Sequence, residues 1–345
     1  MARRFVLHLD LDEFIAAVER LRHPELEGKP IVVGGDGDPT KRGVVSTASY
    51  EARAFGIRSA MPLRTAYKRN PDAVFLPVDE HAYLKASRGV MDVLRTFGAP
   101  VEVAGWDEAF MAAETDDPEP LAREIQARVL ERTRLWSTIG IGDNRLQAKL
   151  ASGLGKPRGV FVLTGETWAD AMDGQPTSEL WGIGSRTAAK LEALGVRTVA
   201  ELAHADPDVL GGRFGPRTGP WLARLASGEG SAEVHPEGWI ARGSGREHTF
   251  QKNLTDPDEI ASEVERLARE VAGDIARERR RAVRVIVKVR FAPFFTHTHG
   301  VPLTDATADP DAIAQAAARA LAKFDLDRPV RLLGVRAELE DPGSG

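Results

Sequence analysis

The sequence predicts an α+β chain built from several domains. Strand and helix patterns alternate up to about residue 168, and residues 177–227 have the pattern of short helices separated by glycine turns. Strands then return with two amphipathic helices after residue 244. At 345 residues the chain is too long for one compact core and suits two to four domains.

Each element follows from its local pattern. Residues 5–11 alternate apolar and polar side chains, which predicts a strand, and Asp12 stands where the N-cap of the next helix is expected. A strand at 137–142 leads into a helix that either Asp143 or Asn144 caps. The other expected elements are strands at 31–35, 43–47, a pair within 101–112, 246–251, 282–292 and 330–339, and helices at 50–55, 63–69, 84–97 and around 121–129.

Composition excludes several classes of protein. Cysteine is absent, so neither a disulfide framework nor a thiolate metal site is possible, and a reducing cytoplasm is expected. The apolar run after Arg4 ends at Asp10, too early for a signal peptide or a membrane span. The net charge of −5 argues weakly against a nucleic-acid partner, but local clustering of cations matters more for binding phosphate.

Three acids stand out by position: Asp10 at the end of an apolar strand, and Asp107 with Glu108 inside a second strand region. A carboxylate buried in a strand costs several kcal/mol unless a cation or hydrogen bonds compensate it. Converging carboxylates suit Mg²⁺, and two such ions stabilise the attacking and leaving oxygens of a phosphoryl displacement. Taken singly, Asp10 is better explained as a cap and the Asp107–Glu108 pair as a polar turn, but the joint placement of the three acids favours a metal site.

The motifs around these acids resemble those of the Y-family translesion DNA polymerases, in their DinB-type branch. Asp10-Leu11-Asp12-Glu13-Phe14 followed by Ala16-Ala17-Val18-Glu19 is similar to the opening motif of that family, and Gly105-Trp106-Asp107-Glu108 is similar to its second acidic motif. Gly105 and Trp106 differ from the residues that are commoner at these two positions of the family motif. The acidic ligands are unaffected, but the resemblance does not define the packing beside the primer end.

The resemblance implies a right-hand polymerase: a palm with a βαβ-type sheet, small fingers, a helical helix–hairpin–helix thumb and a βαβ-type little finger. It also implies that Asp10, Asp107 and Glu108 hold two Mg²⁺ ions, with Mn²⁺ as an alternative, and that the Leu11 backbone carbonyl completes one site. The expected boundaries are 1–12 and 80–168 for the palm, 13–79 for the fingers, 169–230 for the thumb, 231–243 for the linker and 244–340 for the little finger.

The stretch from Thr47 to Arg53 resembles the family's triphosphate-binding motif. Tyr50 and Arg53 lie three residues apart and share a helix face, where a guanidinium can hold phosphate oxygens. Thr47 can donate to the same phosphates, and Lys156 matches the family's phosphate lysine. Taken alone, Arg53 and Lys156 are more often ordinary solvated charges, but within the matched motifs contact with the triphosphate is favoured.

Ile15 occupies the position of the family's steric gate, next to Phe14. An aromatic ring normally lies there under the sugar and collides with a 2′-hydroxyl. Ile15 is aliphatic and smaller, so we expect weak discrimination against ribonucleotides. The alternative is a core isoleucine, with the gate rebuilt by a shifted backbone or by Tyr50.

The segment Leu180-Trp181-Gly182-Ile183-Gly184 followed by Arg186 has the pattern of a helix–hairpin–helix, with a degenerate partner at 214–219. Its glycines permit a tight turn, and N–H groups at the start of the second helix can bind a phosphate oxygen. Hairpins of this kind contact the DNA backbone without reading sequence. A plain αα turn is the simpler alternative.

The last domain carries seven basic residues and one acid between Arg277 and Arg290. If this segment is a strand, Val283, Val285, Val287 and Val289 lie on one face and Arg284, Lys288 and Arg290 on the other. Arg242, Ser244, Arg246 and His248 alternate in the same way. We therefore expect a sheet with one basic face of uniform sign, suited to the backbone of duplex DNA; a solvated sheet face of mixed charge is the alternative.

The expected reaction is attack of a primer 3′-hydroxyl on the α-phosphate of a dNTP, or of an rNTP, on primer–template DNA. No further acidic constellation suggests a proofreading nuclease. We expect a monomer without membrane contact, and weak use of a sliding clamp because Leu339 to Gly345 contains no clamp-binding peptide. A nucleotide cyclase with a similar palm and a silent DNA-binding scaffold are the alternatives, and primer extension separates all three.

Overall fold

The computed structural model describes residues 3–238 and 240–341. The chain forms two compact units, one of Met1–Asp38 and Val44–Gly238, the other of Pro39–Gly43 and Trp239–Gly345. In the described ranges no helix is long and apolar enough to cross a membrane. The last four residues of the stretch considered for clamp binding lie outside the described residues.

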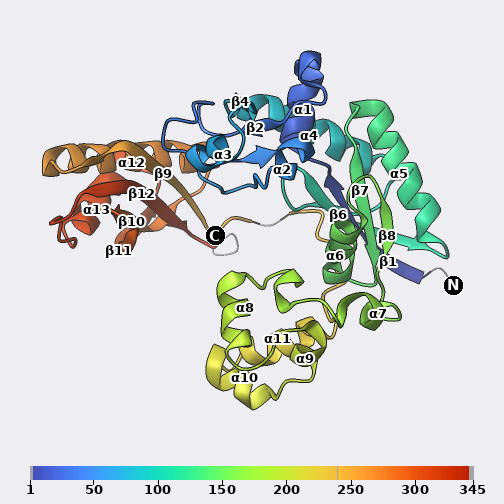
Figure 1. Ribbon diagram of the computed structural model, residues 1–345. Helices are drawn as coiled ribbons and strands as arrows, with labels where there is room; N and C mark the ends of the chain where they lie inside the picture. Colours follow the sequence, from blue (N-terminus) through green and yellow to red (C-terminus); the bar gives the residue numbers. More distant parts are fainter. Residues whose placement is uncertain (1–2, 239, 342–345) are drawn as a thin grey trace. The chain divides into compact units, whose positions relative to one another are not determined.

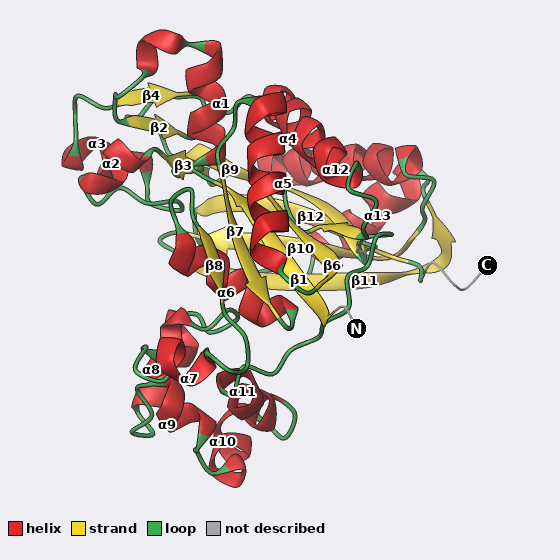
Figure 2. Cartoon of the chain, turned by 90° about the vertical axis from the view of Figure 1, so that its right-hand side faces the viewer, coloured by secondary structure: helices red, strands yellow, loops and turns green. Residues whose placement is uncertain are grey.

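The first unit is built on a five-stranded sheet in the order β5-β6-β1-β7-β8. Helices α4 and α5 lie on one face of this sheet and α6 on the other (Figures 1 and 2). The elements are β1 (Arg3–Leu11), α4 (Glu80–Arg95), β5 (Val101–Val103), β6 (Glu108–Thr115), α5 (Pro118–Thr133), β7 (Ser137–Gly142), α6 (Arg145–Gly155) and β8 (Val160–Val162).

Alternation along β1 divides its residues between the two faces. Phe5, Leu7 and Leu9 belong to the core formed with α4 and α5, as the apolar pattern predicts. His8 and Asp10 have the opposite parity and face α6. Asn144 caps α6 by accepting a hydrogen bond from the Gln147 backbone N–H at 3.0 Å, which decides between the two expected caps.

A smaller three-stranded sheet, in the order β3-β2-β4, has its own core around Val32, Ile57 and Leu63. The strand expected at 43–47 is only Thr47–Ala48, because Val44 is half exposed and forms a single isolated bridge to Pro62. The elements are α1 (Phe14–Arg22), η1 (Pro24–Leu26), β2 (Ile31–Val33), β3 (Thr47–Ala48), α2 (Tyr50–Ala54), α3 (Leu63–Arg69) and β4 (Val74–Leu76).

The expected cap of α1 is wrong. The N-cap is Glu13, in the left-handed region at φ 43°, and no side chain caps the helix. Asp12 is buried instead, and its carboxylate accepts hydrogen bonds from Tyr50, Thr138 and the Arg158 backbone. These donors come from distant segments, so the local sequence gives no sign of them.

The helical region forms a separate core around Leu191, Leu202 and Leu222. Gly182 has φ +102°, a conformation that few side chains adopt, so the turn before α8 requires glycine there. The helices are α7 (Trp168–Met172), η2 (Thr177–Glu179), α8 (Ser185–Glu192), α9 (Val199–Ala203), α10 (Pro207–Phe214) and α11 (Thr218–Ala226).

The second unit is a four-stranded sheet in the order β11-β10-β12-β9, with α12 and α13 packed on one face (Figure 2). Strand β11 is absent from the sequence-based expectations because its side chains are polar and mostly exposed. The elements are β9 (Gly243–Leu254), α12 (Pro257–Arg277), β10 (Ala282–Phe291), β11 (Phe295–Thr307), α13 (Pro310–Leu321) and β12 (Val330–Leu339).

Strand β10 confirms the predicted alternation with one exception. Val285, Val287 and Val289 are buried against the helices, and Arg284 and Lys288 lie on the opposite face. A register shift between Ala282 and Arg284 interrupts the alternation and leaves Val283 38% exposed.

The basic face is not of uniform sign. Lys288 forms an ion pair with Glu247 of β9, and Arg284 lies 3.9 Å from Glu338 of β12. Pairing with neighbouring strands brings these acids onto the face, which alternation along β10 alone does not reveal.

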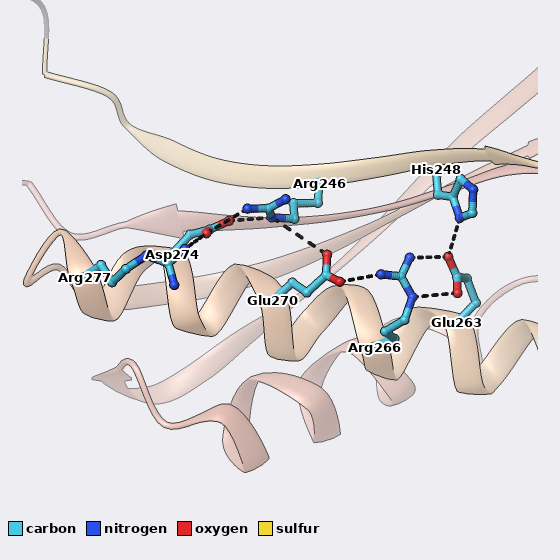
Figure 3. A network of polar contacts seen from close by, with 7 residues as sticks. All are labelled: Arg246, His248, Glu263, Arg266, Glu270, Asp274 and Arg277. Carbon is cyan, nitrogen blue, oxygen red and sulfur yellow. Dashed lines mark hydrogen bonds and ion pairs between the residues drawn. The ribbon is translucent and has the colours of Figure 1, made fainter. Parts of the chain in front are cut away.

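Arg246 lies on the other face of the sheet from Lys288. It stands opposite the buried Val335 in the β9–β12 pair, on the side covered by α12. Its guanidinium donates two hydrogen bonds to the Asp274 carboxylate, at 2.6 and 2.9 Å (Figure 3). His248 likewise contacts Glu263 of α12, at 2.7 Å. The expectation that these residues extend the basic face of β10 is therefore wrong.

Candidate active site

The three predicted acids gather where β1 meets β6. Asp10 and Glu108 are directly opposed partners in the antiparallel pair, and the Leu11 backbone N–H donates to the Asp107 carbonyl at 2.8 Å. Asp107 lies in the turn that joins β5 to β6, not inside a strand as expected. Directly opposed side chains in such a pair lie about 4.5–5.5 Å apart at Cβ.

This arrangement concentrates negative charge. The pKa of Asp107 is raised by burial and then by the charges of Asp10 and Glu108. Asp10 Oδ1 is buried and accepts no hydrogen bond, although it forms an ion pair with the Lys156 ammonium. Carboxylates that repel one another and lack donors are stabilised by a nearby cation.

A second lysine and a histidine support Glu108. The Lys149 ammonium of α6 donates to the Glu108 carboxylate. The fully buried His8 ring lies 2.8 Å from Ser152 Oγ through Nδ1, and 3.4 Å from both Lys149 Nζ and Glu108 Oε2 through Nε2. Burial lowers the pKa of His8. Helix α6 therefore supplies a layer of side chains directly behind this carboxylate.

The donor set suits a hard divalent cation. Mg²⁺ takes oxygen ligands, and here three carboxylates and the adjacent Leu11 backbone come from two neighbouring strand ends. Among the described residues, no three Asp, Glu or His side chains lie close enough together to hold a metal ion as they stand. Lys156 and Lys149 hold Asp10 and Glu108, so a bound cation has to compete with them for these oxygens.

The expected triphosphate residues Tyr50 and Arg53 share a face of α2, with the Arg53 guanidinium 4.9 Å from the centre of the Tyr50 ring. The Tyr50 hydroxyl donates to Asp12 Oδ1 at 3.1 Å, and the Tyr50 backbone N–H donates to Glu13 Oε2 at 2.6 Å. Burial and then Asp12 raise the pKa of Tyr50. Thr47 lies in the short strand β3, just before α2.

Ile15 and Phe14 occupy the first turn of α1. Phe14 is buried in the core that β1 forms with α4 and α5, whereas Ile15 is only partly buried at the edge of this core. The Tyr50 hydroxyl is held by Asp12 and the Tyr50 backbone N–H by Glu13, so hydrogen bonds fix both ends of this residue beside α1.

A cavity of about 430 Å³ borders Asp10 and is lined by Lys149, Lys156 and Trp181, among others. Trp181, in the predicted hairpin, is 45% exposed, and Lys149 Nζ lies 5.6 Å from the centre of its ring. Gly184 is the N-cap of α8, with Ile183 buried before it and Arg186 exposed in its first turn. Arg242 is exposed just ahead of β9.

Sequence analysis missed His8, Asp12, Lys149 and Ser152 as parts of this site. His8 alone carried a detectable signal, because an imidazole at an inward position of an apolar strand requires a polar partner. The other three owe their places to contacts more than 35 residues away in sequence.

Comparison with known proteins identifies the family of this chain. Residues 9–153 match the model of the impB/mucB/samB family, and residues 242–340 match the C-terminal domain of that family. DNA polymerase IV 2 of Mycobacterium tuberculosis is 48% identical over 342 residues, which cover 98% of this chain and 99% of the relative. DNA polymerase IV of Desulfatibacillum aliphaticivorans is 37% identical, covering 99% of this chain and 87% of the relative.

Solved structures give the same result. A Y-family DNA polymerase chimera matches with a TM-score of 0.86 at 26% identity, covering 97% of this chain and 98% of the chimera. DinB from Sulfolobus solfataricus matches with a TM-score of 0.63 at 27% identity and the same coverage. The fold is that of a nucleic-acid polymerase. The chain belongs to the DinB-type branch of the Y-family, and it is a DNA-directed DNA polymerase of the translesion class.

Proposed function

We propose that this polymerase joins a nucleotide to a primer 3′-hydroxyl by two-metal chemistry, with Asp10, Asp107 and Glu108 as the metal ligands. The observation that carries the proposal is the direct opposition of Asp10 and Glu108, with the Asp107 turn beside them. Divalent ions bound there supply the positive charge that lowers the pKa of the primer hydroxyl and neutralises the leaving pyrophosphate.

The side chains around the acids bind and orient the substrate. Arg53 and Lys156 attract the triphosphate, and Tyr50 and Thr47 add hydrogen bonds to it. The Asp12 carboxylate positions the Tyr50 hydroxyl, and His8 with Lys149 positions Glu108. Lys156 exchanges its partner from Asp10 to a phosphate oxygen when the nucleotide enters.

DNA is held by two surfaces in this proposal. The α8 hairpin, with Gly182, Ile183, Gly184 and Arg186, contacts the backbone in the thumb, residues 169–230. The helix-free sheet face of the little finger, residues 244–340, contributes Arg284, Lys288 and Arg290. Arg246 is not part of this second surface, because it is paired with Asp274 on the other side.

Ile15 gives the enzyme weak discrimination against ribonucleotides. An isoleucine at the edge of the core presents less surface under the sugar than an aromatic ring does, and a hydrophobic pocket by itself rejects an added hydroxyl only about a hundredfold. We therefore expect both dNTPs and rNTPs as substrates.

Primer extension with a labelled primer–template tests the proposal. Extension that requires a template, Mg²⁺ and all three acids supports it. Extension that persists in the Asp107→Asn variant shows that the reacting centre lies elsewhere. A nucleotide cyclase would leave the primer unchanged and convert the triphosphate to a cyclic product.

A further inference from the structure

The β10–β11 hairpin ends in two exposed aromatic side chains. Phe294 is 65% exposed and Phe295 is 53% exposed, at the end of the sheet where β10 finishes and β12 begins. Large apolar side chains exposed at a hairpin tip are not stabilised by burial in the core of their own unit. Their exposure is therefore a feature to explain by an external ligand.

Each ring has a guanidinium beside it. The Arg331 guanidinium lies 4.6 Å from the centre of the Phe294 ring, and that of Arg328 lies 5.4 Å from the centre of the Phe295 ring. Stacking of this kind presents an aromatic surface and a positive charge together. Phe294 remains mostly accessible although Arg331 contacts it.

Further cations gather at the same end of the sheet. The Arg42 guanidinium donates to the Phe250 carbonyl at 2.9 Å, and Arg290 donates to Thr296 Oγ1 at 2.8 Å. Both cations are close enough to Arg331 to lower its pKa. Burial, then Arg42 and then Arg290 lower the pKa of Arg331. Three guanidiniums that repel one another form a surface to which an anion binds favourably.

These arginines differ from the other cations of the same sheet face. Lys288 is paired with Glu247, and Arg284 lies near Glu338, so acids neutralise that part of the face. Within the described ranges no carboxylate pairs with Arg42, Arg290 or Arg331. Unneutralised positive charge is thus concentrated at the hairpin end, beside Phe294.

We propose that this hairpin tip, defined by Phe294, Phe295, Arg331, Arg290 and Arg42, binds unpaired single-stranded nucleic acid. The guanidiniums hold phosphates, and an exposed ring stacks on a base. A duplex can contact the guanidiniums through its phosphates, but it cannot use the rings, because its bases are already stacked and their faces are not accessible. The proposal goes beyond primer–template catalysis and does not depend on the metal site, because binding is measured without metal or nucleotide.

The test is fluorescence anisotropy with the full chain and three probes: labelled oligothymidylate, an abasic oligomer of the same length, and a blunt duplex. Replacing both Phe294 and Phe295 by Ala should weaken oligothymidylate binding about five- to 100-fold, since base–aromatic stacking contributes about that much per base. The abasic oligomer and the duplex should bind as they do to wild type. Phe294→Trp should preserve the binding of oligothymidylate.

Arg331→Ala should act differently. It should weaken oligothymidylate and abasic oligomer alike, and reduce the salt slope for single strands by about 0.7 per lost phosphate contact, whereas the phenylalanine variants leave that slope unchanged. Val283→Ala, at the other end of β10, and Arg319→Ala, on α13, are the matched controls. Unchanged oligothymidylate affinity in the double phenylalanine variant, or equal losses for all three probes, would overturn the proposal; the first result would point to a protein partner for the tip.

Discussion

Asp10 and Glu108 face each other across the β1–β6 pair, and each is held by a lysine of its own, Lys156 and Lys149. Two carboxylates directly opposed in a sheet repel each other unless cations balance them. The protein thus brings acids and ammonium groups together at one strand end.

Asp10→Asn and Asp107→Asn should each reduce primer extension by at least about 10³-fold, because the amide keeps the shape of the carboxylate but not its charge. Folding and primer–template affinity should stay close to wild type. Steady-state extension, thermal unfolding and anisotropy measure the three quantities. Glu114→Gln, exposed further along β6, is the matched control. Substantial turnover by either variant at ordinary Mg²⁺ concentrations would contradict the ligand assignment.

His8→Ala should weaken the support of Glu108, because the ring contacts both Ser152 and the Lys149–Glu108 ion pair. Removing a group behind a metal ligand typically costs about 10–100-fold in metal affinity or activity. Mn²⁺ binding measured by electron paramagnetic resonance, alongside the Mg²⁺ dependence of extension, should show this loss. If only thermal stability falls and Mn²⁺ affinity does not change, His8 serves the fold alone.

Ile15→Phe should restore discrimination against ribonucleotides by roughly ten- to 100-fold, since a ring under the sugar collides with the 2′-hydroxyl. Insertion of a single dNTP should change little in the same variant. Single-nucleotide insertion kinetics with paired dNTP and rNTP give the ratio directly. Wild type that already excludes rNTP as strongly as the Phe variant would mean that another group closes the pocket.

Replacing Arg284, Lys288 and Arg290 by Ala should weaken duplex binding alike on all sequences and flatten its salt dependence by about 0.9 per lost phosphate contact. Among the single variants, Arg290→Ala should have the largest effect, because Glu247 partly neutralises Lys288. Anisotropy across a salt series measures both affinity and slope, with Arg319→Ala as control. An unchanged slope in the triple variant would show that this face does not contact DNA.

Asp274→Asn should reduce stability more at neutral pH than in acid. The hydrogen bonds from Arg246 lower the pKa of Asp274, so their stabilisation is full above its ordinary pKa and is lost as pH falls through the lowered value. Arg246 is about half exposed, so we expect only about 0.5–1 kcal/mol. Thermal unfolding at pH 7 and near pH 3 should show a difference from wild type that is smaller in acid. A constant difference at both pH values would point to packing; Glu259→Gln, exposed on the same helix, is the control.

The sequence by itself determined the fold class, most of the strands and helices, and the acids at the strand ends. Period-two alternation sorted the valines of β10 from its cations, and the acidic motifs identified the family. Local patterns are enough to assign strands and helices because they show which residues of one element lie on the same face.

Only the tertiary structure decided which residues meet. The β1–β6 register opposes Asp10 to Glu108, and the packing of α6 brings Lys149 and Ser152 to His8. Alternation along β9 was correct, but it could not reveal that Arg246 faces α12. The physical reason is that strand pairing and helix packing join segments far apart in the chain. The partners of a charged side chain, and hence its role, are therefore set by hydrogen-bond register and not by neighbours in sequence.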